Sequence, residues 1–98
     1  MEGGNTISTL STKEISDALK VLNSWEFKDN AFRKTYIFNS YMESIEFIYR
    51  LAKKAEEANH HPDMVVGWCK IDLGFTSHDK GGVTKTCVEM AKQADAVI

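Results

Sequence analysis

The chain has 98 residues, of which 43% are hydrophobic, and its 12 basic and 14 acidic residues give a formal net charge of -2. This length suits one compact domain, and so small a charge gives no electrostatic field for gripping a nucleic-acid backbone. No apolar run approaches the roughly 20 residues that span a bilayer, and the first residues lack the basic and apolar regions of a signal peptide. We therefore expect a cytoplasmic protein with no membrane contact and no direct nucleic-acid ligand.

Small size also bears on assembly and on the cysteines. A domain of this length buries only about two-thirds of its unfolded surface, so self-association is a common way to bury more, and we expect a homodimer or homotetramer.

Cys69 and Cys87 are too far apart for a metal or redox motif, and we expect reduced thiols with packing roles.

The N-terminal part contains a tail and a first helix. Residues 1–10 are small, polar and without periodicity, which predicts a flexible tail before a single domain over residues 11–98. Ser11 and Glu14 have the spacing of a capping box, in which both side chains satisfy free amides at a helix start. Apolar residues then follow at helical spacing and predict a helix to about Asn23: Ile15, Ala18, Leu19 and Leu22.

A hairpin and a long helix should follow. Residues 25–38 are aromatic and β-branched and are interrupted by Asp29-Asn30, which predicts a β-hairpin with its turn at that pair. A second capping box, Ser40 with Glu43, predicts a helix through Ala58. Its expected buried face is Tyr41, Ile45, Ile48, Ala52 and Ala55, with Phe47 and Leu51 beside it.

The last third predicts two more strands and a helix. Pro62 should end the long helix near the preceding histidines, and residues 64–66 and 68–76 then have the pattern of two strands interrupted at Gly67. Gly81-Gly82 predicts a turn, and Thr84 is a natural N-cap for a C-terminal helix. The order α-β-β-α-β-β-α predicts an α+β fold, a four-stranded antiparallel sheet with three helices packed on one face. A partner subunit is expected on the open face or at a sheet edge.

All three histidines of the chain lie close to this predicted helix end or in the segment after the last strand: His60, His61 and His78. Imidazole titrates near neutral pH, so histidine is a natural proton carrier. Glu56 lies one helical turn before His60 and is expected to accept a ring proton from it, while the negative end of the helix would favour its protonated form. His60 is thus a candidate general acid, although spacing does not show which histidine gives a proton and which takes one.

The combined pattern of Glu56, His60-His61-Pro62, Trp68 and His78 resembles the pterin-4a-carbinolamine dehydratases, and the resemblance covers nearly the whole chain. It implies a hydro-lyase that converts 4a-hydroxytetrahydropterin to quinonoid dihydropterin and water in tetrahydrobiopterin recycling, by histidine general acid/base catalysis without a cofactor or metal. It also implies an oligomer. The implied catalytic set is Glu56, His60, His61 and His78, and the implied substrate-binding set is Asn59, His60, His61, Thr76, Ser77, His78 and Asp79.

Two positions leave alternatives open. Cys87 stands where relatives usually carry an aspartate; that aspartate either takes part in the chemistry or completes a helix cap with the residue at Thr84, and we favour the cap. Trp68 is equally consistent with a buried core position and with a pocket wall.

Two other functions compete with the enzyme. The resemblance also allows a non-catalytic dimerisation or transcription-coactivator module, but the intact histidine trio favours catalysis. A three-histidine zinc site is disfavoured because adjacent histidines rarely present both rings to one ion and no fourth ligand is evident.

Overall fold

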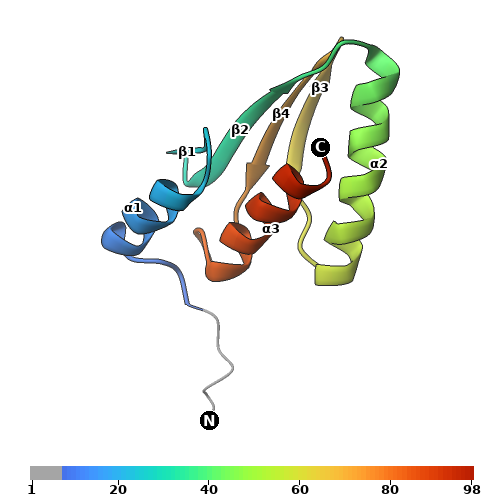
Figure 1. Ribbon diagram of the computed structural model, residues 1–98. Coiled ribbons are helices and arrows are strands. Elements are labelled where there is room, and N and C mark those ends of the chain that lie inside the picture. Colours follow the sequence, from blue (N-terminus) through green and yellow to red (C-terminus); the bar gives the residue numbers. More distant parts are fainter. Residues whose placement is uncertain (1–7) are drawn as a thin grey trace.

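The fold was obtained as a computed structural model that describes residues 8–98. Its elements follow the order predicted from the sequence (Figure 1): α1 Thr12–Val21, β1 Glu26–Lys28, β2 Ala31–Ile37, α2 Tyr41–Ala58, β3 Asp63–Gly67, β4 Lys70–Phe75 and α3 Lys85–Ala96. Of the expected tail, residues 1–7 lie outside the described residues, whereas Thr9 bridges Thr84 and the Leu10 amide donates to the Val83 carbonyl at 2.9 Å. In residues 8–98 no helix combines the length and apolar character needed to cross a bilayer.

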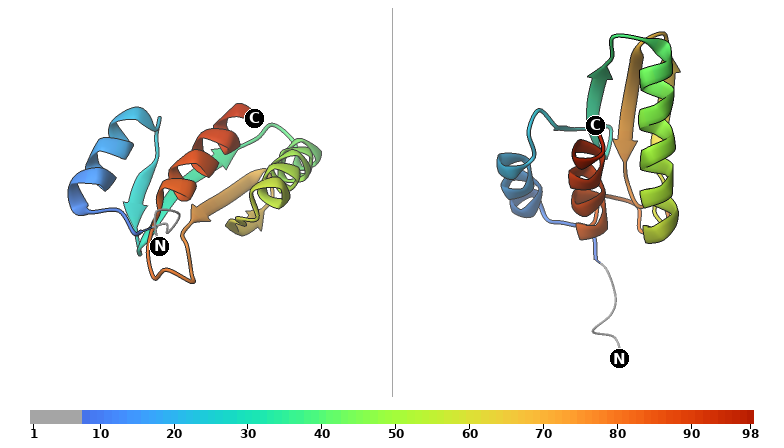
Figure 2. Two further views of the ribbon diagram at one scale, coloured as in Figure 1. Left: turned by 90° about the horizontal axis from the view of Figure 1, so that it is seen from below. Right: turned by 45° about the vertical axis from the view of Figure 1, so that its right-hand side comes forward.

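The four strands form one antiparallel sheet, as predicted, and their order in it is β1-β2-β4-β3. All three helices lie on the same face of this sheet, with α3 between α1 and α2 (Figures 1 and 2). The core lies between these two layers. Its largest fully buried side chains come from β2, β4 and α2: Phe32, Ile71, Leu73, Phe75, Phe47 and Leu51.

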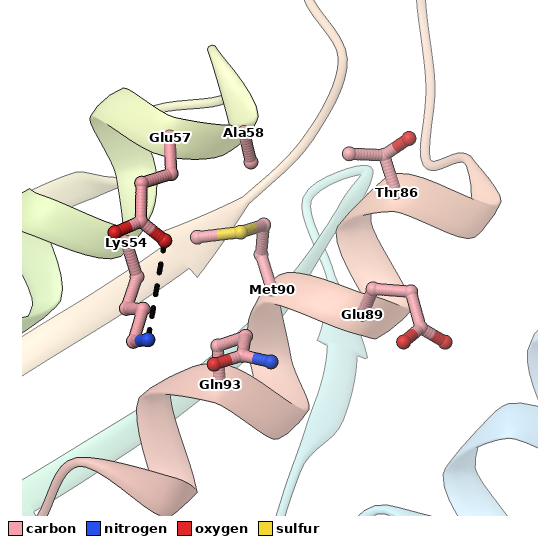
Figure 3. Close-up of a pocket in the computed structure, with 7 residues that line it drawn as sticks. All are labelled: Lys54, Glu57, Ala58, Thr86, Glu89, Met90 and Gln93. Carbon is pink, nitrogen blue, oxygen red and sulfur yellow. Dashed lines mark ion pairs between the residues drawn. The ribbon is translucent and has the colours of Figure 1, made fainter.

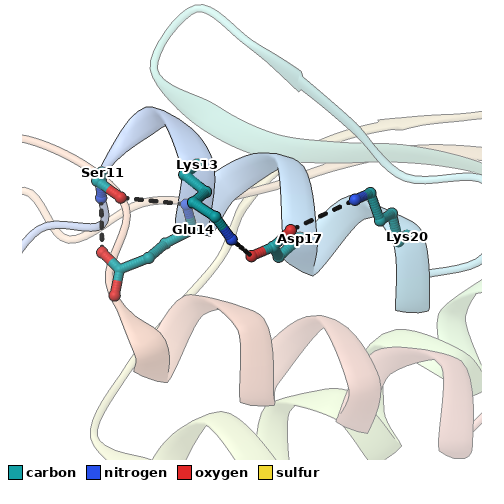
Figure 4. Close-up of polar contacts among 5 residues, drawn as sticks. All are labelled: Ser11, Lys13, Glu14, Asp17 and Lys20. Atoms are coloured by element: carbon teal, nitrogen blue, oxygen red, sulfur yellow. Dashed lines mark hydrogen bonds and ion pairs between the residues drawn. The ribbon is translucent and has the colours of Figure 1, made fainter.

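The first helix begins as its sequence indicates (Figure 4). The Ser11 Oγ accepts a hydrogen bond from the Glu14 amide at 3.1 Å, and the Glu14 carboxylate accepts one from the Ser11 amide at 2.8 Å. These two bonds satisfy amides that have no partner inside the helix. The capping box predicted for α1 is therefore confirmed.

The second helix differs from its prediction in two details. The Ser40 Oγ caps the Glu43 amide at 3.1 Å, but the Glu43 carboxylate accepts from the Asn39 amide, one residue earlier than a capping box requires. The predicted apolar face is also partly wrong, because Tyr41 is 47% exposed and Ala52 is exposed. The residues buried against the sheet are Ser44, Phe47, Leu51 and Ala55.

The difference between the predicted and the observed buried face of α2 has a local cause. Phe47 and Leu51 are the large side chains that reach the sheet, and the position one turn before Phe47 on their stripe is Ser44. Burial of a serine would normally cost free energy, but the Ser44 hydroxyl donates to the Tyr41 carbonyl at 2.6 Å. A stripe containing this serine is hard to recognise from hydropathy alone.

Both hairpins have two-residue turns. The turn predicted at Asp29-Asn30 is confirmed, and the φ values of these residues, 51° and 59°, have the signs of a type I′ turn. In the second hairpin Gly67 pairs with Lys70, so Trp68 and Cys69 form the turn. The prediction that the last strand begins at Trp68 was wrong, and so was the alternative that Trp68 lies in the buried core, because its exposed fraction is 83%.

Candidate active site

His60 is positioned by the way in which α2 ends. Asn59 adopts the left-handed conformation with φ 50° and ψ 44°, and the His60 amide donates to the Ala55 carbonyl at 3.0 Å. This Schellman-type ending turns the chain back toward the sheet. The His60 ring consequently lies nearly parallel to the Phe75 ring of β4, with 6.2 Å between centroids and 16° between planes. Its Nε2 lies 3.3 Å from the Cys87 Sγ of α3.

The surroundings of His60 favour its neutral form. Burial lowers the pKa of His60, and the charges of His61 and His78 lower it further, while Asp79 acts in the opposite direction and is outweighed. The expectation that the helix end would favour a protonated ring was therefore wrong, because loss of solvent dominates. His60 and His78, from two distant chain segments, line two hollows that share Ser77.

The other two histidines are more exposed, and each contacts a carboxylate. The His61 Nε2 contacts the Glu56 Oε2, and the His78 Nε2 lies 3.1 Å from the Asp63 Oδ2. The predicted pairing of Glu56 with His60 was wrong, because the left-handed residue between the helix and His60 turns that ring toward the core and leaves His61 beside the helix end. A carboxylate on one ring nitrogen fixes the orientation of the imidazole and leaves the other nitrogen for a substrate.

The predicted binding residues, except His61, line two neighbouring hollows. One, of about 180 Å³, contains His60 with Asn59, Asp79 and Lys80. The other, of about 220 Å³, contains His78 with Thr76, Asp63 and Arg33. Ser77 borders both hollows.

Ser77 belongs to a buried polar network beneath His60. Its hydroxyl lies 2.8 Å from the Thr84 Oγ1 and 3.4 Å from the Cys87 Sγ. The Thr84 amide donates to the same sulfur at 3.4 Å, so the cysteine makes the contact through which an aspartate at this position would cap the helix. Cys87 thus caps α3 and also contacts the ring of His60.

Sequence reasoning did not find several residues at this site. Asp63 was not recognised as the partner of His78, and Arg33, Lys80 and Thr84 were not expected in the hollows. Lys80 could have been found, since it continues the segment that already held His78 and Asp79. Asp63 and Arg33 carry no local signal, because only the pairing of strands brings them near the histidines.

A separate groove of about 300 Å³ lies between α2 and α3 (Figure 3). An ion pair of 3.9 Å between Lys54 and Glu57 borders it, and the Met90 side chain points into it. Ala58 and Thr86 line both this groove and the His60 hollow. None of the predicted site residues lines the groove between α2 and α3. In the described part of the chain, no three His, Cys, Asp or Glu side chains are arranged to hold a metal ion.

A four-stranded antiparallel sheet covered on one face by three helices, with a histidine cluster at the end of the long helix, defines a small α+β class of protein. The model of the pterin 4 alpha carbinolamine dehydratase family matches residues 8–97, and the chain belongs to this family.

Individual relatives agree with this assignment. The chain is 35% identical over 89 residues to a protein of Sulfurisphaera tokodaii and 38% identical over 89 residues to one of Roseiflexus sp.. Each alignment covers 91% of this chain and 96% of the relative, and both relatives are named "Putative pterin-4-alpha-carbinolamine dehydratase". A crystal structure from Brucella melitensis, described as a transcriptional coactivator/pterin dehydratase, matches with a TM-score of 0.89 at 26% identity, over 92% of this chain and 98% of that chain.

Proposed function

We propose that the protein is a hydro-lyase that dehydrates 4a-hydroxytetrahydropterin to quinonoid dihydropterin and water in tetrahydrobiopterin recycling. The observation that carries this proposal is the placement of the histidines: the half-buried His60 and the carboxylate-paired His78 line two hollows that share Ser77, and His61, paired with Glu56, follows His60 in the chain. Membership of the dehydratase family supports it.

The reaction needs two proton transfers at adjacent atoms of the pterin. A proton must reach the hydroxyl on carbon 4a, so that the carbon–oxygen bond breaks and water leaves. Another must leave nitrogen 5, whose electron pair then forms the new double bond to carbon 4a. Imidazoles can perform both steps near neutral pH, and a positioned acid or base typically contributes about 10² to 10⁴ in rate.

The environments of the rings suggest how these roles divide. His60 is uncharged at neutral pH, because burial lowers its pKa, and it therefore suits the role of proton acceptor. His61 and His78 are each held by a carboxylate and suit proton donation to the leaving hydroxyl. The polar side chains of the two hollows, including Asn59, Ser77 and Asp79, would hydrogen-bond the flat heterocycle.

A stopped-flow measurement of carbinolamine decay tests the proposal directly. Wild-type protein is expected to accelerate the decay at neutral pH, and a variant in which His60, His61 and His78 are all alanine is the matched control. That variant should reproduce the uncatalysed rate. Wild-type protein that leaves the decay unchanged would show that this chain is not a dehydratase.

We also propose that the chain forms a homo-oligomer through the free edge of β3. This strand is at the end of the sheet, and the hairpin carries exposed apolar side chains, with exposed fractions of 68% for Val65 and 83% for Trp68. An unpaired apolar edge strand readily pairs with a second copy.

Sedimentation velocity tests this assembly. The wild type is expected to sediment as a dimer or tetramer, and a Val65→Glu/Trp68→Ser variant as a smaller species. Val21→Ser is a matched control, because Val21 is 69% exposed but lies at the end of α1, far in sequence from the strand. A monomeric wild type, or equal effects of both changes, would contradict the proposed interface.

A partner-binding role is a second candidate function, favoured by exposed apolar residues on α2. Met42 and Tyr49 are 63% and 64% exposed, although a long helix packed on a sheet normally exposes polar side chains. The triple histidine variant separates the two functions, because loss of catalysis with full binding of an amphipathic-helix partner would assign α2 to a coactivator-type role.

A further inference from the structure

Cys87 is fully buried, and its sulfur is the meeting point of four polar groups. The Thr84 amide, the Ser77 hydroxyl and the His60 Nε2 lie 3.4, 3.4 and 3.3 Å from Sγ, and the Thr84 hydroxyl lies 3.6 Å away. The amide can only donate, so it uses a sulfur lone pair. Cys87 is the sole hydrogen-bond partner of the His60 ring within residues 8–98.

We propose that Cys87 is the positioning residue of His60: the sulfur accepts the Nε2 proton, and Nδ1 is left as the unprotonated nitrogen that takes a proton from the substrate. The link between the two side chains stands on their geometry, and only the substrate step rests on the proposed function. In this arrangement the Cys87 thiol donates a hydrogen bond to the Ser77 hydroxyl oxygen. The Ser77 hydroxyl in turn donates one to the Thr84 Oγ1 at 2.8 Å. The thiol, the Ser77 hydroxyl, the Thr84 amide and the His60 ring then each have an acceptor.

The chemical nature of residue 87 should decide the charge of His60. A buried carboxylate at hydrogen-bond distance from Nε2 would strongly favour an imidazolium. A thiol at the same place offers a hydrogen bond without a negative charge. The side chain at position 87 therefore determines whether His60 is neutral or protonated.

The other charges around His60 do not have the effect that a carboxylate at position 87 would have. His61 and His78 oppose protonation, and Asp79, which favours it, is exposed and outweighed by the burial of the ring. Lys80 lines the same hollow and adds a positive charge. His60 is thus held neutral by the combination of burial and an uncharged partner.

Long-range ¹H–¹⁵N NMR of the full chain reads the charge and tautomer of His60 directly. At pH 7 the wild type is expected to show a neutral His60 with its proton on Nε2. Cys87→Ser should keep that state, because a hydroxyl can also accept the bond, and Cys87→Ala should lose the tautomer preference. Cys87→Asp should raise the protonated fraction at pH 7 roughly tenfold and move the optimum of carbinolamine decay to higher pH.

Cys69→Ser is the control, since Cys69 lies in the β3–β4 turn, and it should leave the His60 signals unchanged. A wild-type His60 that is charged at pH 7 or carries its proton on Nδ1 would overturn the proposal. So would an unchanged titration in Cys87→Asp or, if that variant does not fold, an unchanged tautomer in Cys87→Ala. Correct NMR behaviour in a wild type without dehydratase activity would contradict the proposed function and leave the role of Cys87 intact.

Discussion

Replacing His60 with alanine is expected to lower the turnover of carbinolamine by about 10² to 10⁴, the usual contribution of one positioned acid or base. His60 is the histidine with the most defined position, because the end of α2, the Phe75 ring and the Cys87 sulfur all fix it. The acidic limb of the pH–rate profile should disappear with it, since that limb reports protonation of the acceptor. Single-turnover stopped-flow kinetics between pH 5 and 9 measure both effects.

Loss of activity must be separated from loss of structure, because the His60 ring also packs on Phe75. His60→Gln keeps a polar side chain able to reach the sulfur, so it should preserve the melting temperature and still lose the activity. His61→Ala and His78→Ala remove more exposed rings and should each reduce turnover without destabilising the fold. Equal activity in all three alanine variants and the wild type would exclude histidine catalysis.

Local signals explain why the secondary structure could be predicted from the sequence. Ser11 with Glu14 marks the start of α1, Asp29-Asn30 supplies a turn with two positive φ angles, and Thr84 precedes α3. Each of these features depends on residues within four positions of one another. The antiparallel sheet follows from the order of the elements, because short hairpins pair neighbouring strands.

The predictions that were wrong concern residues that only the folded chain brings together. Glu56 was assigned to His60 by helical spacing, but a single left-handed residue between helix and ring gave it to His61. Trp68 was placed on a strand, although the pairing of Gly67 with Lys70 leaves it in an exposed turn. The histidine segments themselves were recognised because their pattern is unusual, whereas the contact between Cys87 and His60 spans 27 positions and has no sequence signature.

The same limitation hid a polar cluster that joins α3 to the sheet. The Asp95 carboxylate accepts hydrogen bonds from the Trp25 Nε1 at 3.0 Å, the Lys34 Nζ at 2.8 Å and the Tyr36 hydroxyl at 2.5 Å. The Lys34 ammonium also lies 5.9 and 5.0 Å from the centres of the Trp25 and Tyr36 rings. The side chain of Lys34 is only 14% exposed, so the carboxylate compensates a poorly solvated ammonium.

Asp95→Ala is expected to reduce the free energy of unfolding by about 2 to 4 kcal/mol at pH 7, because the Trp25 and Tyr36 donors lose their acceptor and the poorly solvated Lys34 ammonium loses its counter-ion. Asp17→Ala is the matched control. Asp17 also contacts two lysines, Lys13 at 2.9 Å and Lys20 at 3.5 Å (Figure 4), but on an exposed surface. Its loss should change the free energy of unfolding far less than the loss of Asp95 does, because water screens exposed ion pairs. Urea denaturation at low salt measures both variants.

The effect of Asp95 should also depend on pH in a defined direction. Burial alone would raise the pKa of Asp95, but the bonds from Lys34, Tyr36 and Trp25 outweigh it and hold the pKa below its ordinary value of 3.8. The unfolded chain therefore binds the proton first, so this stabilisation is complete above about pH 5 and is lost as the pH falls through the pKa of the folded state. The difference in free energy of unfolding between wild type and Asp95→Ala should therefore shrink below pH 4. A difference that stays constant down to pH 2, or one no larger than that of Asp17→Ala, would mean that the cluster does not hold α3 to the sheet through the charge of Asp95.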